Sequence, residues 1–184
     1  MTVSKRDALL DTAERLFYTE GFHATGIERL VSEAGVARMT LYHHFPAKEA
    51  LVAAVLARRH HHYLAMLRTA LDDATGDPIA GLVDAHCGWL AEYSAQGCML
   101  VKAMGEYEHH DPAVHSHALA CKREVIGVIR EAAARDGAGD PERLAGRIYL
   151  VLEGATQALP VVGAERTRAD ARALLGAMHG RGAP

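Results

Sequence analysis

Aromatic residues, cysteines and long apolar runs are all scarce in this 184-residue chain. Phe and Trp are few while Ala, Leu, Glu and Arg are abundant, which favours helices over strands. The three cysteines, Cys87, Cys98 and Cys121, form no CxxC pair and indicate free thiols in a reducing cytosol. No stretch reaches the roughly 18 apolar residues of a membrane span, and the first residues lack the apolar segment of a signal peptide. We therefore expect a cytoplasmic protein without membrane contact.

The chain also lacks a large excess of charge of one sign, and it lacks the common catalytic motifs. The formal net charge is -3, which excludes a basic protein that coats nucleic acid. Residues 1–60 hold eight Lys or Arg against seven Asp or Glu, whereas residues 61–184 hold 12 against 16. A local patch in the first third could still approach phosphate. There is no G-x-S-x-G, P-loop, GxGxxG or HExxH motif, so we expect neither an enzyme nor a cofactor.

Helical signals run through the whole chain, and we expect an all-α fold. Residues 4–20 have apolar residues at helical spacing, with Ser4 as the expected N-cap and Gly21 as the stop. Asp-Pro pairs, which combine a cap with proline at the first helical position, begin three later helices. The later helical segments cover residues 77–95, 97–107, 111–135, 140–159 and 167–178.

Two short helices precede a long one. Thr25 and Glu28 have the spacing of a capping box, and Gly35 ends this short helix. A second short helix spans residues 37–44, and Pro46 separates it from a long helix that begins near residue 47. This outline is typical of a helix-turn-helix, although an ordinary helical hairpin has the same outline. We expect a DNA-binding domain over residues 1–46 and a second domain over residues 47–184.

Residues 21–49, GFHATGIERLVSEAGVARMTLYHHFPAKE, are more specific than the outline. This run resembles the DNA-binding region of the TetR/AcrR family of regulators, and the resemblance covers residues 5–52. Beyond it, a GC…EY pattern at Gly97-Cys98 and Glu106-Tyr107 is similar to some family members. The resemblance implies a dimeric regulator that a small effector releases from palindromic double-stranded operator DNA.

The physical chemistry of the segment agrees with the resemblance, since a recognition helix presents polar and cationic groups at its N-terminal end. Arg38 suits a guanine edge, hydroxyl groups suit backbone oxygens, and Lys48 points a cation at phosphate. The expected DNA-binding residues are Thr25, Arg38, Met39, Thr40, Tyr42, His43 and Lys48. For Tyr42, a half-buried place in the core is the alternative.

Three other residues of the same segment form its apolar face, and one departs from the family pattern. Val36, Leu41 and Phe45 are expected to lock the recognition helix to the preceding helices through Phe17, Ile27 and Leu30. The family usually has Ser or Thr where this chain has Ala37. Alanine at that helix N-cap forfeits about 1 kcal/mol of capping.

A set of aromatic, methionine and polar residues in the second domain is expected to hold the effector, which the resemblance implies is a small molecule. Methionine and aromatic side chains inside a helical bundle suit an adaptable, mainly apolar pocket. An ordinary core is the alternative for any single member. The set is Tyr63, Met66, His86, Trp89, Tyr93, Met99, Met104, Tyr107 and Tyr149, with Gln157 as a polar companion.

Histidine and cysteine leave a metal- or redox-responsive regulator of the same fold as the alternative. His60, His61 and His62 are consecutive, so a helix points them in different directions and they cannot share a metal. His117 and Cys121 lie four residues apart on one helical face, near His109, His110 and His115. Their spacing matches no metal motif, so we expect no metal site. Cys98 could be a reactive thiol, although a buried structural cysteine is the plainer interpretation.

The last two helices carry apolar residues suited to a four-helix dimer interface. The expected interface residues are Leu144, Ile148, Val151, Leu152 and Ala155 on one helix and Leu174, Leu175 and Met178 on the other, with Gly154 allowing close approach. A two-fold dimer would place two recognition helices on a palindromic site.

Overall fold

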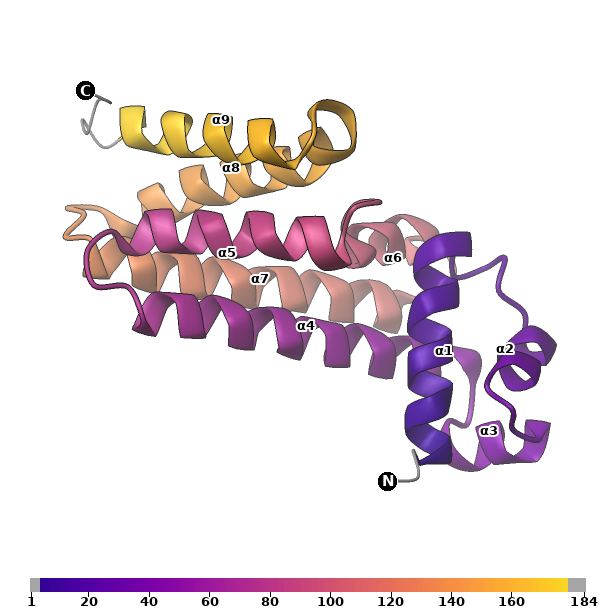
Figure 1. Cartoon of the computed structure of the whole chain (residues 1–184). Coiled ribbons are helices and arrows are strands. Elements are labelled where there is room, and N and C mark those ends of the chain that lie inside the picture. Colours follow the sequence, from indigo (N-terminus) through magenta and orange to yellow (C-terminus); the bar gives the residue numbers. More distant parts are fainter. Residues whose placement is uncertain (1–3, 179–184) are drawn as a thin grey trace. The chain divides into compact units, whose positions relative to one another are not determined.

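The computed structural model describes residues 4–178, and every regular element in that part of the chain is an α-helix (Figure 1). The expected all-α fold is confirmed. The helices are α1 (Lys5–Glu20), α2 (Ile27–Glu33), α3 (Arg38–His44), α4 (Lys48–Asp72), α5 (Pro78–Tyr93), α6 (Met99–Tyr107), α7 (Pro112–Arg135), α8 (Pro141–Val162) and α9 (Ala164–Met178). None of the helices between residues 4 and 178 has the length and apolarity that crossing a membrane requires.

Side-chain caps begin several helices where the sequence predicts them. The Ser4 hydroxyl oxygen accepts a hydrogen bond from the Asp7 amide at 3.1 Å and begins α1. Asp77 and Asp140 accept amide hydrogen bonds from the first turns of α5 and α8, and a proline follows each of them. These caps satisfy amides that the helix itself leaves without acceptors.

The cap predicted at Thr25 is wrong. Gly26 is the N-cap of α2 and supplies no side-chain hydrogen bond. The Thr25 side chain is fully buried, and its hydroxyl donates to the Gly21 carbonyl oxygen at 2.8 Å. Thr25 therefore ties the α1–α2 turn to the end of α1 rather than capping the next helix.

The described residues form two compact units, and the units do not divide at residue 46. The first unit consists of residues up to His60 together with Met99–Cys121, so it contains α6 as well as α1–α3. The second consists of His61–Cys98 together with residues from Lys122 onward. Helices α4 and α7 each contribute residues to both units.

In the first unit, α1, α2 and α3 contact one another around a fully apolar centre (Figure 1). Phe17 of α1, Leu30 of α2 and Leu41 of α3 are completely buried, and Phe45 is nearly so. Ile27 and Val36, which were expected to join them, are half-buried. The predicted attachment of the recognition helix to α1 and α2 is therefore confirmed for its main residues.

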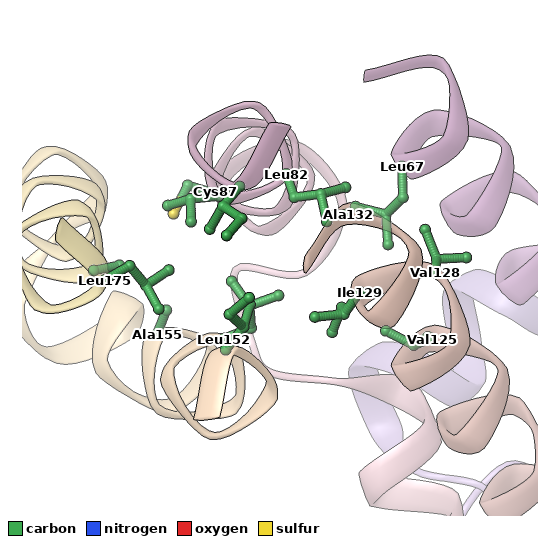
Figure 2. Packing of buried hydrophobic residues seen from close by; sticks show 14 of the residues in the cluster. Leu67, Leu82, Cys87, Val125, Val128, Ile129, Ala132, Leu152, Ala155 and Leu175 are labelled. Carbon is green, nitrogen blue, oxygen red and sulfur yellow. The ribbon is translucent and has the colours of Figure 1, made fainter. Parts of the chain in front are cut away.

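In the second unit, α5 packs against α8 and α9, and buried side chains fill the space between them (Figure 2). Leu82 and Cys87 of α5, Leu152 and Ala155 of α8 and Leu175 of α9 point toward this centre. Each of these residues is at most 5% exposed.

This packing corrects the expected dimer interface, because several of its residues serve the chain's own core. Leu144, Ile148, Leu152, Ala155 and Leu175 are all buried. Of the expected interface residues, Leu174 and Met178 do lie at the surface, with exposures of 55% and 39%. Leu150 at 72% and Val161 at 81% are exposed apolar residues that were not in the expected set.

Candidate DNA interface and effector site

Helix α3 presents a polar, exposed surface because its apolar residues are anchored below it. Leu41 and Phe45 are buried, which turns the opposite face of the helix outward. Arg38 and His43 are exposed, and Met39 has 77% of its surface exposed. An exposed methionine beside an exposed arginine at the start of a short helix suits contact with another molecule.

Two neighbouring side chains, those of Glu28 and Tyr42, contact the Arg38 guanidinium. Its Nη1 atom donates to Glu28 Oε1 at 2.6 Å, and its guanidinium carbon lies 5.8 Å from the centre of the Tyr42 ring. Hydrogen bonding with Tyr42 and the charge of Glu28 raise the pKa of Arg38 above its ordinary value. The guanidinium therefore remains charged and can exchange the exposed Glu28 carboxylate for an acceptor on DNA.

The other expected DNA-binding residues are less exposed. Thr40, Tyr42 and Lys48 are half-buried, with part of each side chain at the surface. Burial lowers the pKa of Lys48, and the charges of Glu49 and Glu106 oppose that shift. Thr25 does not fit the expected role, because a fully buried side chain cannot contact a phosphate.

Helix α6 holds the turn between α1 and α2, a role that no pattern in the sequence predicted. The Glu106 carboxylate accepts hydrogen bonds from the Phe22 amide at 3.1 Å and the His23 amide at 2.8 Å. Lys102 Nζ donates to the Tyr18 carbonyl oxygen at 2.9 Å, near the end of α1. The GC…EY pattern drew attention to Glu106 and Tyr107 in the sequence, but it did not indicate which residues they contact.

The turn accepts this carboxylate because residue 21 has no side chain. Gly21 has a φ of 97°, where side chains are rarely tolerated. A Cβ atom at this position would also lie 3.2 Å from Glu106 Oε1. Next to it, the buried Tyr107 ring meets the Phe22 ring edge-on, with the ring centres 5.8 Å apart.

Four of the expected effector residues lie together in the second unit. The Trp89 ring centre is 4.6 Å from that of Tyr93 and 5.3 Å from that of Tyr63. The Tyr63 hydroxyl lies 2.7 Å from His86 Nδ1. Met66 and Tyr149 are partly buried and pack against the same core. This part of the set remains a candidate binding site.

The other members lie elsewhere. Met99, Met104 and Tyr107 belong to the first unit, and Tyr107 packs against Phe22 rather than against the aromatic residues of α5. Gln157 is exposed. Helical periodicity gave no means of separating these residues, because both α5 and α6 carry apolar residues at helical spacing.

The histidines and cysteines are dispersed. His117 Nε2 lies 3.9 Å from Cys121 Sγ, as their spacing predicts. Between residues 4 and 178, no group of three or more His, Cys, Asp or Glu side chains is placed to hold a metal ion. All three cysteines are free thiols; Cys98 is half-buried and the other two are buried.

Known proteins share both the helix-turn-helix and the fold of the whole described chain. Residues 9–55 match the family model described as bacterial regulatory proteins, tetR family. A TetR-family transcriptional regulator from Streptomyces coelicolor superposes with a TM-score of 0.85 at 28% identity, over 96% of this chain and 93% of that one. Residues 9–55 therefore resemble the DNA-binding region of the TetR family, and the described chain has the fold of a TetR-family regulator. The expected resemblance is thus confirmed.

Curated transcriptional regulators of the helix-turn-helix type match over shorter segments. The transcriptional activator FasR of Mycolicibacterium smegmatis is 32% identical over 99 residues, which are 53% of this chain and 45% of that protein. The transcriptional repressor ComR of Escherichia coli is 33% identical over 106 residues, or 54% and 49% of the two chains. The matches thus span less than half of these relatives. Since the relatives are transcriptional regulators, the expectation that this chain is not an enzyme is confirmed.

Proposed function

We propose that this chain is a homodimeric transcriptional repressor of the TetR type that binds a palindromic operator and is released by a small, largely apolar effector. The observation that carries the proposal is the surface of α3, where Arg38, Met39 and His43 are exposed on a helix anchored by Leu41. Such a helix can enter the major groove, with Arg38 on a base edge and Thr40, Tyr42 and Lys48 on the backbone.

The apolar surface of α8 and α9 supports the dimer. Leu150, Val151, Ala158, Leu174 and Met178 line a groove of about 360 Å³ on these two helices. An apolar groove open to water on two neighbouring helices is a candidate surface for association with a partner. A second copy of the chain, related by a two-fold axis, would cover it and complete a four-helix interface.

We favour repression that the effector relieves, because this is the form of regulation that the family resemblance implies. The named relatives include both an activator and a repressor, so the direction of regulation needs its own test. The effector need only prefer the released state by about 2.7 kcal/mol to change operator occupancy a hundredfold.

The decisive experiment selects DNA with the purified full chain from a random library and measures binding to the enriched sequence by fluorescence anisotropy. We expect an inverted repeat bound by a dimer, with a steep dependence on salt. A reporter gene behind that sequence should be repressed by the protein. Failure to enrich any sequence, together with salt-independent binding, would contradict the proposal.

A further inference from the structure

The second unit contains a cluster of polar side chains, contributed by several helices and only partly buried. Tyr63 comes from α4, Cys98 precedes α6, Lys122 comes from α7, and Tyr149 and Glu153 come from α8. The charges of these groups influence one another, since Cys98, Glu153 and Tyr149 all contribute to the pKa of both Tyr63 and Lys122. Polar groups that converge in a largely apolar bundle are candidates for ligand recognition.

The proton on the Tyr63 hydroxyl can be placed. His86 Nε2 lies 3.0 Å from the Leu152 carbonyl oxygen, which can only accept, so this ring nitrogen carries the hydrogen. Burial lowers the pKa of His86 to about 4, so the ring is neutral and Nδ1 accepts. The Tyr63 O–H therefore donates to Nδ1. Its oxygen can offer a ligand only lone pairs.

Lys122 has hydrogen-bonding capacity to spare. Its side chain is 12% exposed, and Nζ donates to Glu153 Oε1 at 2.6 Å. Nζ also lies 5.8 Å from the centre of the Tyr149 ring. An ammonium group has three N–H donors, and within residues 4–178 Glu153 is its hydrogen-bond acceptor. At least one N–H is thus available to a bound molecule.

The state of charge selects the kind of acceptor. Burial would lower the pKa of Lys122, but Cys98 and Glu153 raise it above its ordinary value, so the group stays a cationic donor. Glu153 already balances that charge. A ligand carboxylate would bring an uncompensated negative charge to this neutral, partly buried pair, and a ligand amine would bring an uncompensated positive charge. A neutral oxygen acceptor fits without either cost.

We propose that the effector is a neutral carbonyl compound with an aromatic or otherwise apolar body, whose carbonyl oxygen accepts a hydrogen bond from Lys122 Nζ. This inference rests on the proposed function, which supplies the effector. The half-buried Tyr63 ring, whose centre lies 5.3 Å from that of the buried Trp89 ring, would provide an apolar surface for the body. A group able to donate, such as a hydroxyl, would add a bond to the Tyr63 oxygen.

Four compounds of matched size test the class directly: 4-phenyl-2-butanone, butylbenzene, 3-phenylpropanoate and 3-phenylpropylamine. Binding to the full chain without DNA is measured by calorimetry and by the emission of Trp89, the single tryptophan of the chain. We expect the ketone to bind at least tenfold more tightly than the other three, because the others lack a neutral acceptor for Lys122. Equal binding of butylbenzene and the ketone, or preference for either ion, would overturn the proposal, as would absence of ketone binding.

Variants separate recognition from folding. Lys122→Met should weaken ketone binding about tenfold to hundredfold and leave butylbenzene unchanged, because it removes a charged donor but keeps an apolar side chain. The double variant Lys122→Met with Glu153→Gln removes the ion pair as a whole and guards against an uncompensated carboxylate. Lys5→Met, on the exposed first turn of α1, is the control. Unchanged ketone binding in the double variant would make the ion pair purely structural.

The experiments distinguish failure of the carbonyl proposal from failure of the proposed function. Operator binding is measured on the same preparations by anisotropy in the absence of any compound. If the chain binds the ketone through Lys122 but enriches no operator sequence, the result contradicts the proposed function alone. A chain that binds its operator, yet prefers butylbenzene or an ion, would sink the carbonyl proposal alone.

Discussion

Glu106 makes two polar contacts with His23, one through its side chain and one through its backbone. Its carboxylate oxygen Oε2 accepts from the His23 amide, and its backbone carbonyl oxygen lies 2.8 Å from His23 Nε2. The two residues are 83 positions apart in the chain, yet both belong to the first compact unit. The turn between α1 and α2 is thus fixed by α6.

Replacing Glu106 with Gln should loosen that turn. An amide has one acceptor oxygen where the carboxylate has two, so one of the two amides loses its partner and the free energy of unfolding falls by about 1–2 kcal/mol. Glu108→Gln removes the same charge from an exposed position near the end of α6 and should cost little. Urea denaturation of both variants checks this. Equal losses in the two would mean that net charge, rather than the contact, is responsible.

Leu150 and Leu152 give a matched pair for the dimer. Leu150 is 72% exposed on α8, so Leu150→Asp should leave the fold intact and yield monomers in sedimentation. Leu152 is 1% exposed within the core, so Leu152→Asp should instead lower the free energy of unfolding by about 4 kcal/mol or more. A dimer that survives Leu150→Asp would place the interface on other helices.

Arg38 and Lys48 should affect DNA binding in different ways. Arg38→Ala should cost about 1–3 kcal/mol on the preferred operator and much less on unrelated DNA, because Arg38 is expected to contact a base. Anisotropy titrations with both DNAs measure the difference. Similar losses on the two DNAs would make Arg38 a backbone contact.

Lys48→Ala should weaken binding to all sequences alike and reduce the slope of log K against log salt by about one unit, as expected for one lost phosphate contact. The titrations are repeated at several salt concentrations, with the exposed Lys5→Met variant for comparison. A slope that stays the same after Lys48→Ala would remove Lys48 from the phosphate contacts.

His86 should make stability depend on pH below neutrality. Its pKa is about 4 in the folded protein and near 6.5 when unfolded, so the unfolded chain takes up the proton first as the pH falls. The stabilisation is complete above about pH 6.5, declines from there to about pH 4 and amounts to about 3 kcal/mol. Urea titrations across this range should show a shallower pH dependence in His86→Gln. Parallel curves for the two proteins would exclude His86 as the cause.

The sequence predicted the helices well because their ends carry local chemical signals. The caps at Ser4, Asp77 and Asp140 need only a side-chain oxygen and a nearby amide, which the sequence itself displays. Thr25 was the exception, because its hydroxyl could either cap α2 or donate to a carbonyl oxygen at the end of α1. The sequence does not distinguish these two hydrogen bonds. The structure uses this hydroxyl for the Gly21 carbonyl.

The faces of α8 were harder to predict for a physical reason. This helix has two apolar stripes, one containing Leu152 and one containing Leu150, and periodicity cannot tell which stripe the chain's own core takes. The candidate effector site could be predicted only in part for a similar reason. Tyr107 and Trp89 are both aromatic residues in apolar helical segments, and the sequence does not show that they belong to different units. The Lys122–Glu153 pair lies 31 positions apart and left no sequence pattern.

The first compact unit is assembled from two stretches of chain, and this affects how the protein can be recombined with its relatives. A chimaera that exchanges only residues 1–46 would import a foreign α1–α2 turn onto the resident Lys102, Glu106 and Tyr107. Unless the donor also has glycine at position 21, its side chain would strain the backbone there and crowd the Glu106 carboxylate. The transferable module is the pair of segments, residues 1–60 and 99–121, and α6 must travel with the helix-turn-helix that it holds.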